Sequence, residues 1–154
     1  MPKIDLDAVS AANHTGYPAP FDKAVVGRWY RRLSPPSKIS DFGASHVVLK
    51  SGAWSSQRHW HEGEDELVIM LSGEAVLIED DEETVLRAGD VAAFPKAVRN
   101  GHHLVNRSPA DCVFVVVDGG VNTGGGYSDI DMLFTADGCY VRKDGTPYLG
   151  EVCR

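Results

Sequence analysis

Histidines in two short windows are the side chains of this sequence best suited to bind a metal ion. Four of the six histidines lie at positions 59–61 and 102–103. Residues two apart in a β-strand point to the same side, so His59 and His61 would face one way together. With a carboxylate such as Glu66 from an adjacent strand, they form a facial triad that leaves coordination positions open. A His-x-His motif alone also fits two exposed histidines or a hydrogen-bonded core histidine.

The carboxylate of this triad comes from an acidic segment. Glu66 is one of four acidic residues in HEGEDE, residues 61–66, and a run of charges usually forms a solvated face. The loop at residues 62–65 can nevertheless return the chain so that the next strand pairs beside the first. Glu66 would then enter the same cavity as the histidines, with Val68 and Met70 behind it on the same face.

Short strands are needed to position these side chains, and the chain has the pattern for them. Strand-like segments recur about every 8 to 12 residues, each bounded by turn signals, which is typical of an all-β sandwich or barrel. A break is expected at Ser34-Pro35-Pro36-Ser37. The expected strands are residues 28–33, 46–50, 57–61, 66–71, 74–78, 84–87, 91–94, 102–106 and 111–118.

The spacing of the first metal-binding window resembles the first signature of the cupin superfamily. That signature has a glycine, five residues, His-x-His, three or four residues, a glutamate, six residues and a glycine. Here Gly52, His59, His61, Glu66 and Gly73 follow the pattern, with one extra residue before His59. The six residues between Glu66 and Gly73 select Glu66 among its acidic neighbours.

The second window resembles the second cupin signature. Gly89 and Pro95 have the family spacing, and Ala97 stands where the family usually has glycine. His102 and Asn106 keep the family's His-to-Asn spacing after an insertion of two residues.

The insertion leaves two candidates for the fourth metal ligand. Asn100 occupies the position of the family's histidine, and His102 follows two residues later. The spacing favours His102, with His103 as the alternative. A strand would place the two on opposite faces, so only one of them can bind. A bulge in residues 98–101 could absorb the insertion.

The resemblance implies an all-β fold, the double-stranded β-helix or cupin jelly-roll barrel. The resemblance covers about residues 44–117, which would form the barrel core. The chain length fits a single domain over residues 1–154. The polar segment 1–24 predicts an N-terminal arm, and turn signals in the tail at 127–154 predict a hairpin or flap.

The resemblance also implies one divalent metal ion, zinc, iron, manganese or nickel, on His59, His61, Glu66 and His102. The expected function is that of a metal-dependent enzyme of the isomerase, epimerase or lyase kind, acting on an anionic, sugar-like or small oxyacid ligand. An Fe(II) dioxygenase is one alternative. A non-catalytic small-ligand or sugar-binding module, or a structural dimeric cupin with a vestigial site, is another.

Catalytic residues other than metal ligands are not defined by the motifs. Gln57 shares the expected inward face, and His103 is the second candidate. Other groups that could transfer a proton are Glu64, Asp65 and a tyrosine of the tail. Solvation is the default for arginines, but four of them could recognise a carboxylate or phosphate: Arg28, Arg31, Arg32 and Arg99.

Composition excludes several classes of partner. The chain has 154 residues and a formal net charge of -7, which disfavours nucleic acid because phosphate binding needs clustered Lys and Arg. No apolar run reaches the ~18 residues of a membrane helix, and no secretory signal is visible at the start. Three cysteines without metal-type spacing favour free thiols in a reducing compartment, hence the cytoplasm. A homodimer is expected, since such dimers are the commonest oligomers.

Overall fold

β-Strands dominate the computed structural model, which describes residues 3–148. Three short helical turns accompany them: η1 (Leu6–Ala8), η2 (Lys23–Val25) and α1 (Ser34–Ser37). The strands are β1 (Arg28–Arg32), β2 (Phe42–Leu49), β3 (His59–His61), β4 (Glu64–Ser72), β5 (Glu74–Ile78), β6 (Glu83–Arg87), β7 (Val91–Phe94), β8 (His103–Val105), β9 (Cys112–Gly120), β10 (Gly125–Tyr127), β11 (Leu133–Phe134) and β12 (Tyr140–Val141).

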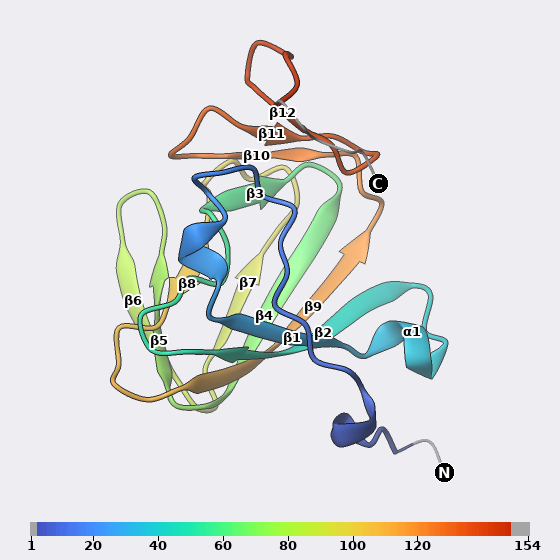
Figure 1. Ribbon diagram of the computed structural model, residues 1–154, viewed down its shortest axis with the longest axis vertical. Helices are drawn as coiled ribbons and strands as arrows, with labels where there is room; N and C mark the ends of the chain where they lie inside the picture. The colour runs from blue at the N-terminus through green and yellow to red at the C-terminus, as the bar shows by residue number, and fades with distance from the viewer. Residues whose placement is uncertain (1–2, 149–154) are drawn as a thin grey trace.

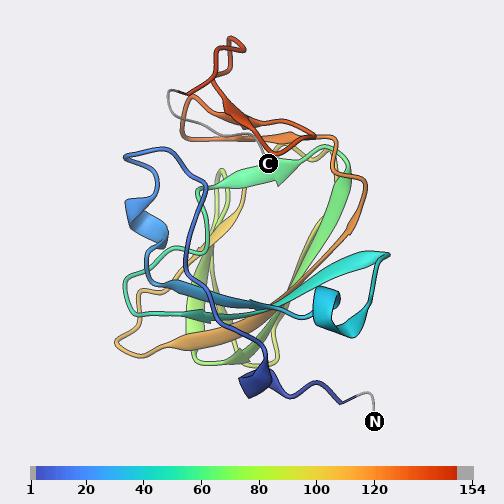
Figure 2. The same ribbon diagram turned by 45° about the vertical axis from the view of Figure 1, so that its right-hand side comes forward.

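The strands form three antiparallel sheets that surround the barrel interior (Figures 1 and 2). The largest sheet has the order β1-β2-β9-β4-β7, and the sheet β6-β5-β8 faces it. The sheet β12-β11-β10-β3 lies across one end of the barrel, where Figure 1 shows β10 to β12 in orange and red. This arrangement confirms the expected all-β jelly-roll fold.

The inward faces of the sheets form one apolar core. Alternation along β9 places Phe114 inside, where it is 1% exposed, and the same alternation on β2 and β4 adds residues from both neighbouring strands. The buried core consists of Val47, Leu49, Ala53, Val68, Met70, Ala75, Leu77, Leu86, Leu104, Cys112 and Phe114.

Gly73 shows why the first signature ends in glycine. It makes the turn between β4 and β5 with a φ of +71°, a left-handed conformation that side chains disfavour. A Cβ at this position would also lie 2.9 Å from the Cα of Cys112. Glycine is therefore required both by the backbone angle and by the close approach of β9.

The two arms extend the barrel beyond the expected core. The N-terminal arm runs along the barrel to the end that carries β10 (Figure 1), and Ala12 bridges to Tyr30 of β1. The C-terminal tail forms the hairpin β11–β12, which joins β10, and β10 pairs with β3. Strand pairing therefore reaches past residues 44–117, and only residues 121–124 connect β9 to β10.

The cysteines correct one expectation. Cys112 is free and buried in the core, as expected. Cys139 is disulfide-bonded, so the expectation of free thiols is wrong for this residue and gives no support for a reducing compartment. Cys153 lies outside the described residues.

The described residues contain no helix of the length and apolar character that a membrane span requires.

Candidate metal centre

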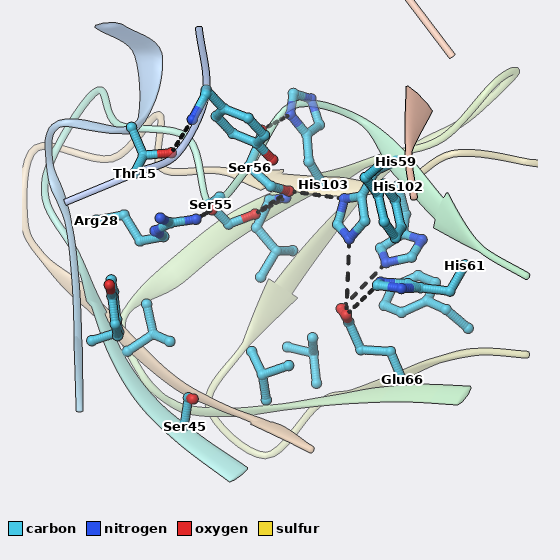
Figure 3. Close-up of a pocket in the computed structure, with 18 of the residues that line it drawn as sticks. Thr15, Arg28, Ser45, Ser55, Ser56, His59, His61, Glu66, His102 and His103 are labelled. Atoms are coloured by element: carbon cyan, nitrogen blue, oxygen red, sulfur yellow. Dashed lines mark hydrogen bonds and ion pairs between the residues drawn. The ribbon is translucent and has the colours of Figure 1, made fainter. Parts of the chain in front are cut away.

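His59, His61 and Glu66 form a cluster that could hold a metal ion. β3 contributes both histidines and β4 contributes the glutamate, and one donor atom from each residue lies within 4.8 Å of the others. The Nε2 atoms of His59 and His61 lie 3.9 Å and 3.5 Å from Oε2 of Glu66. Figure 3 shows the three side chains pointing toward one another. Alternation on β3 and the turn into β4 bring them together as the spacing predicted.

His102 completes the cluster from the other side. Its Nε2 lies 3.2 Å from Oε1 of Glu66. The main chain of His102 pairs with His59 through N–H···O distances of 2.9 Å and 3.1 Å. His103 turns away, with Nδ1 2.9 Å from the carbonyl oxygen of Ser56 and its ring edge against Trp54. The structure thus brings His102, not His103, to Glu66.

The nitrogen atoms of the cluster fit a metal ion. His59 Nδ1 lies 3.0 Å from the carbonyl of Gln57 and 3.1 Å from Oγ of Ser56, which leaves Nε2 for a ligand. Both ring nitrogens of His61 are buried without a hydrogen-bond partner among the described residues. A buried polar atom without a partner is costly, and a metal ion on Nε2 would satisfy one of them. Imidazoles with one carboxylate suit zinc, iron, manganese or nickel.

The protonation states of Glu66 and His102 suit metal binding. Burial raises the pKa of Glu66, but the hydrogen bond with His102 and the close imidazoles of His59 and His61 outweigh burial and hold the pKa well below its usual value. Burial lowers the pKa of His102 to about 4, although its hydrogen bond to Glu66 acts in the opposite direction. The carboxylate is therefore ionised and His102 neutral at neutral pH, which are the states that metal ligands need.

The cluster opens onto a cavity of about 520 Å³. Apolar core residues such as Val47, Leu77 and Phe114 line its wall. Tyr17 of the N-terminal arm and Tyr127 of β10 also line it, with ring centroids 5.6 Å apart. The arm and the tail therefore meet over the same cavity.

Gln57 does not take the expected position. β3 begins at His59, so the strand alternation that would have pointed Gln57 inward does not reach it. Its side-chain Nε2 donates to the carbonyl of Phe21 at 2.9 Å, and Gln57 is not among the residues that line the cavity. The expectation that Gln57 faces the cavity is therefore wrong.

The acidic candidates divide between the site and the surface. Glu64 lies near the cluster, with Oε2 3.5 Å from Nδ1 of His61. Asp65 is exposed and accepts a hydrogen bond from the backbone N–H of Lys96.

The arginine candidates divide in the same way. Arg31 donates to the carbonyl of Val9, and Arg99 pairs with Glu62 at the surface. Arg28 and Arg32 line the cavity.

Asp118 lies beside the cluster and was missed by the sequence analysis. It pairs in register with Glu66 on β4 and with Gly43 on β2. Its carboxylate lies over Gly43, where a Cβ would overlap both oxygens. Burial raises the pKa of Asp118, and the negative charge of Glu66 raises it further. Alternation from Phe114 along β9 is the signal that could have placed Asp118 on the inward face.

Arg58 fixes the chain beside both histidine windows. Its guanidinium pairs with Asp80 and Asp129 and donates to the carbonyl of Gly101, while its side chain is only 11% exposed. Because Arg58 precedes His59 and Gly101 precedes His102, these contacts hold the two ligand-bearing segments in place.

Known proteins share this fold. The family model for the cupin domain matches residues 45–118. A sugar phosphate isomerase of the cupin superfamily from Silicibacter pomeroyi is 38% identical to this chain. The two structures superpose with a TM-score of 0.89, and the match covers 99% of this chain and 100% of that chain. A cupin 2 conserved barrel domain protein from Salinispora arenicola is 28% identical over 59% of this chain and 74% of that one, with a TM-score of 0.52.

A more distant structure agrees in fold alone. The polyketide cyclase RemF from Streptomyces resistomycificus is 19% identical over 84% of this chain and 87% of its own, with a TM-score of 0.68. No curated protein matches the chain. From the site, the fold and the similarity over the whole length of the Silicibacter pomeroyi protein, the chain belongs to the cupin superfamily.

Proposed function

We propose that the protein is a metal-dependent enzyme that isomerises, epimerises or eliminates from a small sugar-like or oxyacid substrate. The observation that carries this proposal is the opening of the ligand cluster onto a cavity of about 520 Å³. Structural metal sites are closed by protein ligands, whereas catalytic sites keep a position for water or substrate. The name sugar phosphate isomerase, given to the 38% identical protein, supports the same class of reaction.

In this proposal His59, His61, Glu66 and His102 hold one divalent ion. The bound ion would act as a Lewis acid that polarises an oxygen atom of the substrate. The apolar wall of the cavity lowers the local dielectric constant and strengthens such electrostatic interactions. Specificity for the substrate then depends on the polar side chains of the opposite wall.

Tyr127 is the group that we assign to hydrogen bonding of the reacting substrate oxygen. Its ring centroid lies 6.1 Å from that of His59, and Tyr127 lines the cavity. Burial and the neighbouring Tyr17 and Tyr140 raise the pKa of Tyr127 well above its usual value, so it holds its proton at neutral pH. This shift makes the phenol a weaker acid, so its O–H is suited to donate a hydrogen bond to a substrate oxygen on which negative charge develops. His103 is less suited, because the carbonyl of Ser56 already engages its Nδ1.

Elemental analysis of protein purified without tag or chelator tests the proposal first. We expect about one metal ion per chain, lost in the His59→Ala, His61→Ala double variant and kept in His46→Ala. His46 is a fitting control because its neighbours Ser45 and Val47 line the cavity, so His46 faces the other side of the sheet. Absence of metal, with no thermal stabilisation by added divalent ions, would contradict a metalloenzyme and favour a binding or structural cupin.

Turnover assays then separate the catalytic alternatives. We expect conversion of sugar phosphates or hydroxy acids that needs the metal and Tyr127, so that Tyr127→Phe keeps the metal and loses turnover. Iron together with substrate-dependent oxygen consumption would instead identify the dioxygenase alternative. Metal-dependent ligand binding without any conversion would identify a non-catalytic binding module.

A further inference from the structure

We propose that Arg28 and Arg32 form an anion subsite that binds a phosphate group of the substrate at the wall opposite the metal ligands. This inference rests on the proposed function, because the subsite would bind the end of the substrate that lies away from the metal in the same cavity. Strand alternation on β1 directs Arg28, Tyr30 and Arg32 to one face. All three residues line the cavity. Arg31, between them, faces the other side and donates to the carbonyl of Val9.

Neutral contacts hold the Arg28 guanidinium in place. Its Nη1 donates to the carbonyl of Ser55 at 2.9 Å, and its Nη2 donates to the carbonyl of His14 at 3.5 Å. Carbonyl groups fix the orientation of a guanidinium without cancelling its charge. None of the ion pairs found between described residues includes Arg28 or Arg32. Both positive charges therefore stay available to a ligand.

The guanidiniums of Arg28 and Arg32 both lie near the aromatic ring of Tyr30. The Cζ atoms of Arg28 and Arg32 lie 5.3 Å and 5.9 Å from the centre of this ring, within the range of cation–π attraction. The hydroxyl of Tyr30 lies 3.1 Å from Nδ1 of His14, which also lines the cavity. Polar groups from β1 and from the N-terminal arm thus surround one part of the wall.

The balance of charge in the cavity favours an anion at this wall. Glu66 is the one carboxylate among the described residues that line the cavity, and the metal cluster uses it. Asp118 lies close enough for Arg32 to lower its pKa, although burial and Glu66 raise that pKa overall. The chain has a net charge of -7, so two arginines without a carboxylate in contact form a positively charged region that is unusual for this protein.

A phosphate monoester matches this positively charged region better than a neutral group does. Two guanidiniums offer parallel N–H donors and two positive charges to a tetrahedral dianion. Figure 3 shows Arg28 on the far side of the cavity from Glu66, with Ser55 and Ser56 between them. A substrate that places its oxygen atoms at the metal end and its phosphate at Arg28 would therefore span the cavity.

Calorimetry with inorganic phosphate tests the subsite in the protein as purified and in the His59→Ala, His61→Ala variant. We expect phosphate to bind both proteins, because the subsite does not need the metal. The R28Q/R32Q variant should bind phosphate at least about tenfold more weakly, since it loses charge-assisted hydrogen bonds. The R31Q/R107Q variant, which removes the same net charge outside the cavity, should bind like the wild type.

Three outcomes would overturn the subsite. The first is a wild-type protein that binds no phosphate at millimolar concentration, and the second is equal binding by wild type and R28Q/R32Q. Phosphate binding that disappears only with the metal ligands would also overturn it, because the anion would then sit on the metal. R32Q alone, at an exposed residue, should weaken binding without disturbing the contacts of Arg28. Arginine-dependent phosphate binding by a wild-type protein that binds no metal, as purified or after metal is added, would keep the subsite and reject the proposed function.

Discussion

Phe94 lies flat against His102, with ring centroids 3.5 Å apart and an angle of 3° between the ring planes. Phe94 comes from β7, at the edge of the large sheet, and its backbone pairs with Glu66 on β4. The stack therefore sets the plane of the His102 imidazole beside the carboxylate that it contacts. Because packing fixes the ring, Nε2 points to Glu66 without needing the metal to orient it.

This relationship predicts which adjacent histidine binds the metal. His102→Ala should lower the affinity for zinc by at least about tenfold, the scale on which metal sites respond to lost supporting groups. His103→Ala should leave that affinity within about threefold, because Nδ1 of His103 contacts the carbonyl of Ser56 and not Glu66. Competition with a chromophoric chelator measures both variants. The assignment fails if His103→Ala is the variant that loses zinc.

Much of this site could be predicted because it depends on local periodicity. His59 and His61 lie on one face of a strand, and the turn at Gly73 fixes how far β4 runs after Glu66. His102 was selected by the His-to-Asn spacing of the cupin signature, while strand alternation allowed only one of the two adjacent histidines to bind. The periodicity argument failed at Gln57, because β3 starts at His59 and alternation cannot be extended into the loop before a strand.

The remaining residues depend on contacts that no spacing encodes. Tyr17 and Tyr127 meet because the N-terminal arm and β10 cross the same end of the barrel. The sequence gives no sign that residues 110 positions apart share a wall. Arg28 and Arg32 were among several arginines with equal claims, and only the pairing of β1 with β2 shows which face they occupy.

The pKa of His102 predicts how acid affects metal-free protein. Its pKa is about 4 in the folded chain and near 6.5 when unfolded, so between these values only the unfolded chain holds the proton. Acid therefore favours unfolding across this window, by roughly 3 kcal/mol at most. Urea titrations of chelator-treated protein should show this loss from pH 6.5 to pH 4. His102→Gln should flatten the slope, and an unchanged slope would disprove the assignment to His102.

The stability of the metal-free protein above neutral pH depends on His61. Burial lowers the pKa of His61, but its contacts with Glu66 outweigh burial and raise the pKa above 6.5. The stability contributed by this pairing is complete below the unfolded pKa and is lost as pH rises through the folded pKa. In urea titrations, metal-free protein should therefore also lose stability above about pH 6.5, and His61→Gln should remove this loss. If His61→Gln still lost stability above about pH 6.5, another group would be responsible for the loss.

Ala97 predicts a substitution that strengthens the fold. It occupies the position where the family has glycine, with a φ of +63°, and its N–H donates to the carbonyl of His61 at 2.8 Å. The left-handed conformation costs a residue with a Cβ about 1–2 kcal/mol, while glycine costs about 0.5–1 kcal/mol in chain entropy. Ala97→Gly should therefore stabilise the protein by about 0.5–1 kcal/mol in urea denaturation.

Ala93, at an exposed position of β7 and without positive φ, provides the control for this gain. Ala93→Gly should destabilise by about 0.5–1 kcal/mol, since there glycine only adds freedom to the unfolded chain. The same sign of change in both variants would mean that Ala97 is not strained.

Gly125 joins the tail to the metal site, and a single methyl group tests that junction. It pairs with His61 across β10 and β3. A Cβ at this position would overlap the backbone carbonyl of Trp60 and the ring of Phe134. Gly125→Ala should therefore push β10 from β3 and destabilise the protein by about 1–3 kcal/mol, as overpacking does. Because β3 carries two metal ligands, the affinity of the Gly125→Ala variant for metal should also fall.

Gly119 on β9 is the matched control, because a Cβ there would meet its nearest atom at 3.6 Å, an ordinary contact. Gly119→Ala should change stability by no more than about 0.5 kcal/mol and leave metal affinity unaltered. Urea denaturation and chelator competition on both variants give the comparison. If Gly125→Ala matched Gly119→Ala in both measurements, β10 could not lie against β3, and Tyr127 would lose its place beside His59. Loss of stability without loss of metal would instead show that the ligands keep their geometry when the tail detaches.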